Sequence, residues 1–467
     1  MPSATRGASD EQRSGAPALP AAAPASIPAD VFAADAPADD APADGDSRHL
    51  PGSRGLRRTQ LALFGAGLAT FLLLYSTQAL LPALSASLRL SPAQASLTVS
   101  AAAIGLALAV IPASALSEKY GRTAVMTTSV FGAVALALVI PFAPDLTVLT
   151  ALRALQGVAL AGLPATAMAY LAEEVHPTAL ASAMGLYVAG NSIGGMSGRL
   201  ISGIVAGSFG WRWGLASVAV LSLLCAVAFR LLIPRARNFR PGPINPAALL
   251  RTVGSHLRNP LLDRLFVLGL LFMTVFGAVY TVMGYRLVAA PFDLSQGLAS
   301  SIFAVYVVGT FASAVSARVT GRFGRRGTLY LAIGTTSAGL LLTLPDSLGS
   351  ALLGLVLITA GFFTGHCVAS ASVGRTAVHG RAQASALYLA AYYLGNSLGG
   401  TLGADAYHSD GWNGTVLVGL AAMALAGAVT LYATARAHST ARTDRTRQAQ
   451  AQAQTQPMRS RISGSGV

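Results

Sequence analysis

The sequence predicts an all-α integral membrane protein, with twelve transmembrane helices in two pseudo-symmetric six-helix bundles. Its composition is the first observation: 53% of the residues are hydrophobic and 11% are charged, whereas soluble proteins carry about a quarter charged residues. The second is a series of apolar runs, each near the ~20 residues that cross about 30 Å of hydrocarbon. The third is an internal repeat, because YVAGNSIGG at 187–195 returns as YYLGNSLGG at 392–400, about 205 positions later.

A second pair of segments at nearly the same spacing supports the repeat. EKYGR at 118–122 is echoed by GRFGR at 321–325, about 203 positions later. Two pairs at one offset imply a duplicated half, and parallel repeats in an apolar chain are typical of transporters with the substrate site between the halves.

The first six apolar runs predict an N-terminal bundle over 56–233, and the last six predict a C-terminal bundle over 261–435. A linker over 234–260 contains several prolines and could include a short surface helix. The twelve runs are 61–81, 95–116, 124–142, 146–171, 181–205, 213–233, 265–285, 297–317, 328–344, 351–373, 384–404 and 415–435.

The two ends of the chain differ from the apolar region. Residues 1–55 are rich in Ala, Pro, Asp and Ser, and residues 436–467 are rich in Gln, Thr and Arg. Neither segment has the apolar periodicity that would give it a buried face, so both are expected to be disordered tails.

The positive charges indicate the orientation. The net charge is +14, but most basic residues fall in short loops on one side of the alternating runs. The positive-inside rule then places both termini in the cytoplasm. This distribution favours contact with membrane lipid and predicts no nucleic-acid partner.

Three motifs carry a resemblance to a known family. Residues 114–122 (SALSEKYGR) resemble the loop signature of the major facilitator superfamily, residues 153–157 (RALQG) its fourth-helix signature, and residues 190–195 (GNSIGG) its fifth-helix antiporter signature. Taken with AYLAEE at 169–174 and RLISG at 199–203, the whole of 61–435 resembles the YnfM-like branch of bacterial exporters. The resemblance implies the major facilitator fold and a multi-pass protein of the bacterial cell inner membrane, expected to be a monomer.

The expected function is secondary active transport by alternating access, with proton-coupled export of a small organic compound or drug. An importer or uniporter of a sugar or metabolite stays open as an alternative, and a membrane sensor that does not transport is less favoured. The sequence has no GxxxxGK[ST] loop for ATP. It has no HExxH cluster either, so no enzyme activity, metal or cofactor is expected.

The loop motif predicts a gate. Gly121 would allow a sharp turn between two helices, while Lys119 and Arg122 stay at the anionic membrane surface. Glu118 could pair with Arg122 or lie at the start of a neighbouring helix, and the resemblance implies a latch on the cytoplasmic side. A basic turn that only sets topology is the alternative. The second copy has Arg322, Gly324 and Arg325, with Gly321 in place of the acid.

Arg153 lies inside the fourth apolar run. A charge at this depth costs about 2.5–3.5 kcal/mol on insertion scales, so it normally faces a polar interior or a partner. Gln156 and Gly157 follow on the same helix face, where Gln156 can share hydrogen bonds with the guanidinium and Gly157 lets another helix approach. The resemblance implies a role in proton coupling or substrate positioning. An arginine that extends to the outer surface is the alternative.

The repeated glycine motif predicts close helix packing with a face that can slide or bend as the bundles rock. Asn191 replaces the proline usual in the family, and Asn191 and Asn396 are expected to hydrogen-bond across the interface between the halves. The motif residues are Gly190, Asn191, Gly194 and Gly195 in the first half, and Gly395, Asn396, Gly399 and Gly400 in the second.

Aromatic and polar residues at membrane depth predict a cavity for an apolar or weakly polar ligand, although packing is the simpler role for each one. The candidates are Tyr75, Gln78, Tyr187, Tyr280, Tyr306 and Tyr392. No run offers a central carboxylate. His366 is a candidate proton carrier, because an unperturbed histidine titrates near pH 6.5; a purely structural role for this single helical histidine is the alternative.

Overall fold

The computed structural model describes residues 48–239, 241–242 and 246–455, and these residues are almost entirely helical. The first half consists of α1 (Arg54–Tyr75), η2 (Gln78–Leu80), α2 (Leu81–Leu88), α3 (Pro92–Tyr120), α4 (Arg122–Val139), η3 (Ile140–Phe142), α5 (Leu146–Leu160), α6 (Gly162–Glu174), α7 (Pro177–Phe209) and α8 (Trp211–Leu232). The second half consists of α9 (Pro246–Leu257), α10 (Pro260–Val288), α11 (Gln296–Ser300), η4 (Ser301–Val305), α12 (Tyr306–Leu342), α13 (Leu348–Thr376) and α14 (Arg381–Thr455).

The described residues contain twelve membrane spans. Nine helical segments are long and apolar enough to cross a bilayer. Two of them are double, because Gln296–Leu342 is broken at Gly324 and Arg381–Ala433 at Gly411, both with positive φ. Dividing those two and adding α7, a 33-residue helix outside the nine, gives twelve. The predicted fold class is therefore confirmed.

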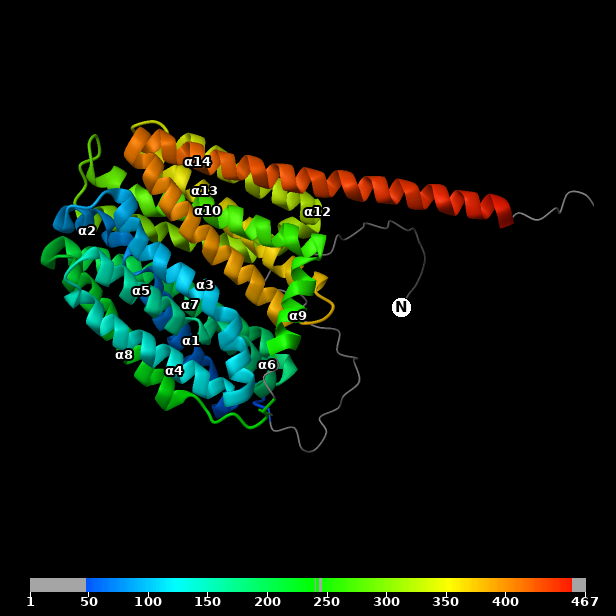
Figure 1. Ribbon diagram of the computed structural model, residues 1–467, viewed down its shortest axis with the longest axis horizontal. Helices are drawn as coiled ribbons and strands as arrows, with labels where there is room; N and C mark the ends of the chain where they lie inside the picture. Colours follow the sequence, from blue (N-terminus) through cyan, green and yellow to red (C-terminus); the bar gives the residue numbers. More distant parts are fainter. Residues whose placement is uncertain (1–47, 240, 243–245, 456–467) are drawn as a thin grey trace, which may run out of the picture.

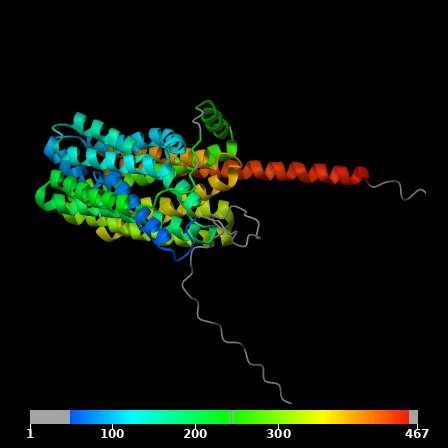
Figure 2. The same ribbon diagram turned by 90° about the horizontal axis from the view of Figure 1, so that it is seen from below.

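The long helices run side by side along one direction, with the first half next to the second (Figure 1). The short helix α2 lies at one end, here called the α2 end, and α9 lies at the other, the α9 end. Figure 2 shows the same arrangement after a quarter turn, with the red end of α14 projecting past the α9 end.

The helix α14 continues to Thr455, beyond residue 435, where we expected a disordered tail to follow the last span. Residues such as Ala, Gln and Arg favour helix, and a transmembrane helix that is already formed removes the cost of nucleation. The other parts of the predicted tails, 1–47 and 456–467, lie outside the described residues.

The repeated glycines pack helices together inside each half. A Cβ added to Gly190, Gly194 or Gly198 of α7 would lie 2.4–2.6 Å from a carbonyl oxygen of α1. A Cβ added to Gly395 or Gly399 of α14 would likewise lie 2.2 or 1.9 Å from a carbonyl oxygen of α10. Close backbone contact of this kind needs residues without a side chain. The motif therefore fixes α7 on α1 and α14 on α10, so the expected sliding face is a tightly packed one.

The hydrogen bonds that join the two halves in the described part of the chain lie on the α2 side of the molecule. Tyr285 of α10 contacts the Leu81 carbonyl at 3.0 Å and the Ser85 hydroxyl at 2.7 Å. The Ser100 hydroxyl of α3 lies 3.0 Å from that of Thr401 in α14. A Cβ on Gly203 of α7 would collide with Ser300 of α11. This end of the interface is closed.

Candidate functional site

The first polar centre of the membrane region lies where α1 breaks. The helix ends at Tyr75 and gives way to the short η2 turn, so carbonyl groups of its last turn are not all satisfied within the helix and need other donors. Arg153 of α5 fills that need: its Nη1 donates to the Leu73 carbonyl at 2.9 Å and its Nη2 to the Leu74 carbonyl at 2.6 Å. Its Nε donates to the Thr98 carbonyl of α3 at 3.0 Å.

Gln156 and Gly157 complete this centre as predicted. The Gln156 side-chain oxygen accepts from Arg153, and its Nε2 donates to the Ala133 carbonyl of α4 at 3.1 Å. A Cβ on Gly157 would lie 2.0 Å from the Ala102 carbonyl oxygen, so the glycine allows α3 and α5 to touch. Arg153 is 1% exposed, which excludes the alternative of a side chain that extends to the surface. The centre joins four helices of the first half.

A small cavity adjoins this centre. Its volume is about 10 Å³, near the lower limit for one water molecule. It is lined by Leu73, Ser76, Ala137, Ile140, Arg153, Gln156 and Leu215. A space of this size cannot hold an organic substrate.

The second polar centre is built around Arg199 of α7, which was not among the predicted site residues. Its Nε donates to the Gln78 side-chain oxygen and its Nη1 to the Gly195 carbonyl, both at 2.6 Å. Gln78 in turn donates from Nε2 to the Thr281 hydroxyl of α10 at 3.1 Å. The chain of contacts therefore crosses from one half to the other. An arginine inside the apolar run 181–205 was the sequence signal for this site, by the same reasoning that selected Arg153.

Three aromatic rings surround the Arg199 guanidinium. Its Cζ lies 3.9 Å from the ring centre of Tyr75, 4.5 Å from that of Tyr306 and 5.3 Å from that of Phe303. These distances are within the range of cation–π attraction. The predicted residues Tyr75, Gln78 and Tyr306 are thus brought together.

An aromatic cluster of the second half continues from this cage. Tyr306 lies 4.9 Å from Tyr280 and 5.2 Å from Phe276 between ring centres, and the Tyr280 hydroxyl is bonded to Thr359 at 2.6 Å. Phe362 joins Tyr392 to this group, since its ring centre lies 3.9 Å from that of Phe276 and 6.2 Å from that of Tyr392. Tyr392 also lies 4.9 Å from His366. Tyr280, Tyr306 and Tyr392 therefore share one cluster, whereas Tyr187 packs against Gly67 of α1.

His366 lies at the edge of the same cluster. Its Nδ1 is 2.9 Å from the Tyr388 hydroxyl, and its ring stacks at 5.8 Å on Phe362. The described residues give it no carboxylate partner.

The two asparagines of the repeat do not meet. Asn191 lies against Gly67 of α1, and the Asn396 backbone lies against Gly277 of α10. Neither side-chain nitrogen nor oxygen of Asn396 has a hydrogen-bond partner among the described residues. The expected hydrogen bond across the interface is therefore absent, because each motif faces a helix of its own half.

The loop between α3 and α4 has the predicted turn but a different ion pair. Gly121 adopts φ 97°, a conformation that favours glycine. Arg122 donates from Nε and Nη2 to Glu173 of α6, at 3.1 and 2.9 Å. Glu118 instead offers its backbone carbonyl to the Gly242 N–H of the linker at 3.0 Å. The pairing of Glu118 with Arg122 was wrong, because Glu173 comes from α6 and only the tertiary fold brings it near.

The second copy of this loop shares the turn without the contacts. Gly324 has φ 69°, and Arg322 and Arg325 are exposed on either side of it. Neither Arg322 nor Arg325 forms an ion pair with a described residue.

Glu174 holds the linker against the first half. Its side chain is fully buried, and its Oε1 accepts the backbone N–H groups of Arg237 and Asn238, both at 2.8 Å. The Glu174 carbonyl also accepts the His49 N–H at 2.7 Å. Burial lowers the pKa of the His49 imidazole, with Glu174 opposing and Arg237 adding to that shift.

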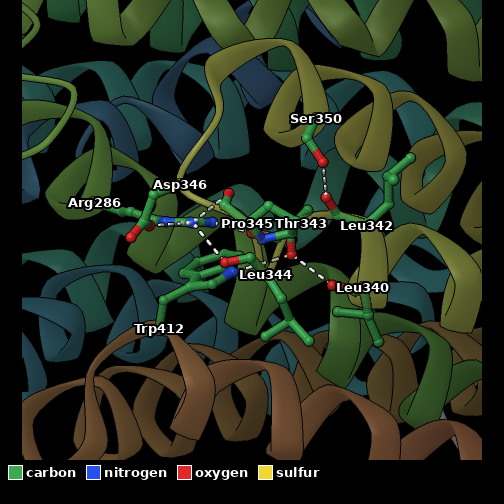
Figure 3. Close-up of polar contacts among 9 residues, drawn as sticks. All are labelled: Arg286, Leu340, Leu342, Thr343, Leu344, Pro345, Asp346, Ser350 and Trp412. Carbon is green, nitrogen blue, oxygen red and sulfur yellow. Dashed lines mark hydrogen bonds and ion pairs between the residues drawn. The ribbon is translucent and has the colours of Figure 1, made fainter.

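A third buried arginine caps a helix at the α2 end (Figure 3). Arg286 donates to the carbonyls of Thr343, Leu344 and Pro345, and to Asp346 at 3.2 Å. Trp412 covers it, with 4.9 Å from Cζ to the ring centre. These carbonyls follow the last turn of α12, so Arg286 has a structural role like that of Arg153.

Comparison with known proteins agrees with this architecture. The chain is 39% identical over 365 residues to the uncharacterized MFS-type transporter YybF of Bacillus subtilis (strain 168), covering 78% of this chain and 90% of that protein. It is 40% identical over 363 residues to the inner membrane transport protein YnfM of Escherichia coli (strain K12), covering 78% and 87%.

A solved structure has the same fold. It is a bacterial homologue of the human lysosomal transporter Spinster, in an inward-facing and unoccupied conformation, with TM-score 0.68, 17% identity and coverage of 82% of this chain and 98% of that one. The family model of the Major Facilitator Superfamily matches residues 63–373 and 265–464. The repeat, the twelve spans, these relatives and this match place the chain in the Major Facilitator Superfamily of membrane transporters, within its YnfM-like branch.

Proposed function

We propose that the chain works by alternating access and exports a small organic compound in exchange for protons. The observation that carries this proposal is the one-sided contact between the halves. Hydrogen bonds from Tyr285, Gln78 and Ser100 close the α2 end. Hydrogen bonds between the halves at one end only are what alternating access requires, because the two bundles can then separate at that end while they close at the other.

The moving units are the proposed bundles 56–233 and 261–435, joined by the linker 234–260. The basic loops at the α9 end support a cytoplasmic location for that end and for both termini. The similarity to YnfM, named an inner membrane transport protein, supports placement in the bacterial inner membrane.

The proposed gate is the α3–α4 loop. Arg122, Glu173 and the linker contact at Glu118 form one connected group at the α9 end. Rearrangement of the bundles would strain this group, and the matching loop at Gly324 has room to join it when the cytoplasmic side closes.

His366 is the proposed proton carrier. It lies at membrane depth among Phe362, Tyr388 and Tyr392, and a histidine can exchange a proton near neutral pH.

The test uses inside-out membrane vesicles with an imposed pH gradient, acidic inside, and a panel of organic acids, bases and neutral compounds. A transported compound is expected to dissipate the gradient with the intact protein, and less so with His366→Gln. His408→Gln, an exposed position on α14, is the matched control. Flux of a labelled compound without any change in the pH gradient would contradict proton coupling and would indicate a uniporter instead.

A further inference from the structure

The charge on Arg199 is not neutralised by any protein group that the structure describes. The side chain is 1% exposed, and the ion pairs of the described residues are Arg122 with Glu173 and Arg286 with Asp346. Buried charges in proteins are normally paired. An unpaired guanidinium at the interface of two mobile halves therefore points to a partner from outside the chain.

Arg199 also has unused capacity to donate hydrogen bonds. A guanidinium has five N–H groups, yet the described contacts of Arg199 use only Nε and Nη1. Its Nη2 makes no hydrogen bond within the described chain. By contrast, all three nitrogens of Arg153 donate to oxygen atoms.

A second unpaired group lies in the same cage. The hydroxyl of Tyr306 is buried and has no hydrogen-bond partner among the described residues, and its ring centre is 4.5 Å from the Arg199 Cζ. A phenol can donate to an anionic oxygen, as a guanidinium can. Together the two groups offer donors to a single acidic group.

The walls of the cage indicate the rest of the ligand. Phe303, Tyr280 and Phe276 continue the aromatic surface from Tyr306, and flat rings of this kind pack against an aromatic body. Tyr306 and Tyr392 are only partly buried, so the cluster keeps accessible surface on the side of the second half. The net charge of +14 favours attraction of an anion.

We infer that Arg199 and Tyr306 bind the carboxylate or sulfonate of an aromatic organic anion. This inference rests on the proposed function and names its substrate class. The ligand is held from both halves, because Arg199 belongs to α7 and Tyr306 to α12. Its acidic group would take the place of the missing counter-charge.

The test is equilibrium binding to the purified full chain in nanodiscs of zwitterionic phosphatidylcholine, which carries no net charge. The probes are 2-naphthoate, naphthalene-2-sulfonate, the neutral 2-naphthamide and the cation 2-naphthylmethylammonium. At least one acid is expected to bind ten or more times more tightly than the amide, and the cation not at all. Acid binding should weaken as salt is added.

The variants assign the site. Arg199→Gln should reduce acid affinity at least tenfold without changing affinity for the amide, and Tyr306→Phe should reduce it a few fold. Arg212→Gln, an exposed arginine of the same half, should leave it unchanged. If Arg199→Gln does not fold, Tyr306→Phe alone tests the site, because it removes only the hydroxyl oxygen and should leave the fold intact.

Other outcomes would overturn the inference: equal affinity for acid and amide, preference for the cation, no acid-selective binding, or acid affinity that survives both Arg199→Gln and Tyr306→Phe. The vesicle assay separates this failure from that of the proposed function. Proton-coupled export of cations alone would contradict the anion site but support the proposed function. Arg199-dependent binding of an acid that is never transported would support the anion site but contradict the proposed function.

Discussion

The two buried arginines of the first half are equally buried, each 1% exposed, but their hydrogen-bond partners differ. Arg153 donates to three backbone carbonyls and to Gln156, and its neighbour Gln156 continues the network to α4. Arg199 donates to Gln78 and to one carbonyl of its own helix, and Gln78 continues to Thr281 in the other half. Each centre is an Arg–Gln pair, but one is internal to a bundle and the other spans two.

This difference indicates that Arg153 has a structural role, whereas Arg199 keeps a donor that is free to bind a ligand. In the proposed alternating-access cycle, a guanidinium whose donors are all used within one bundle is expected to keep its partners. A guanidinium with an unused donor between the two bundles is expected to be able to change partners. The resemblance drew attention to Arg153 for coupling or substrate positioning, whereas the geometry favours Arg199 for the substrate.

The largest expected effect comes from Arg153→Ala. It would leave the Leu74 carbonyl and the Gln156 side-chain oxygen without a donor among the described contacts, and each buried orphan costs roughly 1–3 kcal/mol. We expect a loss of about 3 kcal/mol or more in stability, seen as a lower melting temperature of the detergent-solubilised protein. Arg199→Ala should cost less, because the Gly195 carbonyl also lies within helix α7. Equal losses of stability in Arg153→Ala and Arg199→Ala would contradict the difference between the two arginines.

Gly194→Ala should disturb Arg199 and spare Arg153. The new Cβ would lie 2.4 Å from the Leu68 carbonyl oxygen, pushing α7 away from α1 at a cost of about 1–3 kcal/mol. The readouts are melting temperature and 2-naphthoate binding. Gly185→Ala is the control on the same helix, since a Cβ there meets nothing within 4 Å, and it should be neutral or stabilising.

Thr281→Val removes the acceptor through which the Arg199 centre reaches the second half. One hydrogen bond contributes about 0.5–1.5 kcal/mol, so the closed α2 end should lose population by roughly two- to tenfold. Spin labels at Ala86 and Leu298, in a variant without native cysteines, would report a longer distance at this end. Thr359→Val, which removes a bond inside the second half, should leave the distance distribution as it was.

The smallest effect is expected at His49, a polar contact outside the membrane. Because burial lowers its pKa in the folded protein, the released segment binds a proton more readily, and docking weakens as the pH falls below about 6.5. We expect the free energy of docking of this segment to change by less than about 1 kcal/mol between pH 7.5 and 5.5. The His49 N–H donates to the Glu174 carbonyl and the His176 N–H donates to the His49 carbonyl, so hydrogen exchange at these two amides, corrected for intrinsic rates, measures the change in docking. His49→Gln should abolish the pH dependence, and an unchanged slope in that variant would assign it to another group.

Much of the fold could be predicted from periodicity and repetition. Apolar runs of fixed length, the glycine turns at 121 and 324 and the close packing at Gly157 and Gly190 are local features, because each depends on the residue and its helix. The site was predicted in part. Tyr75, Gln78 and Tyr306 were selected for their depth, but Arg199, which unites them, was passed over. Glu173 was missed as the partner of Arg122 because fifty-one positions separate them.

The sequence by itself determined the class of protein, the twelve spans and the internal repeat, and it predicts the orientation of the charged loops. These follow from hydrocarbon thickness, backbone geometry and charge, which act on each segment separately. Only the tertiary structure decided which arginine is saturated and which glycine face meets which helix. Those outcomes depend on carbonyl oxygens and rings supplied by distant helices, and no spacing along the chain encodes them.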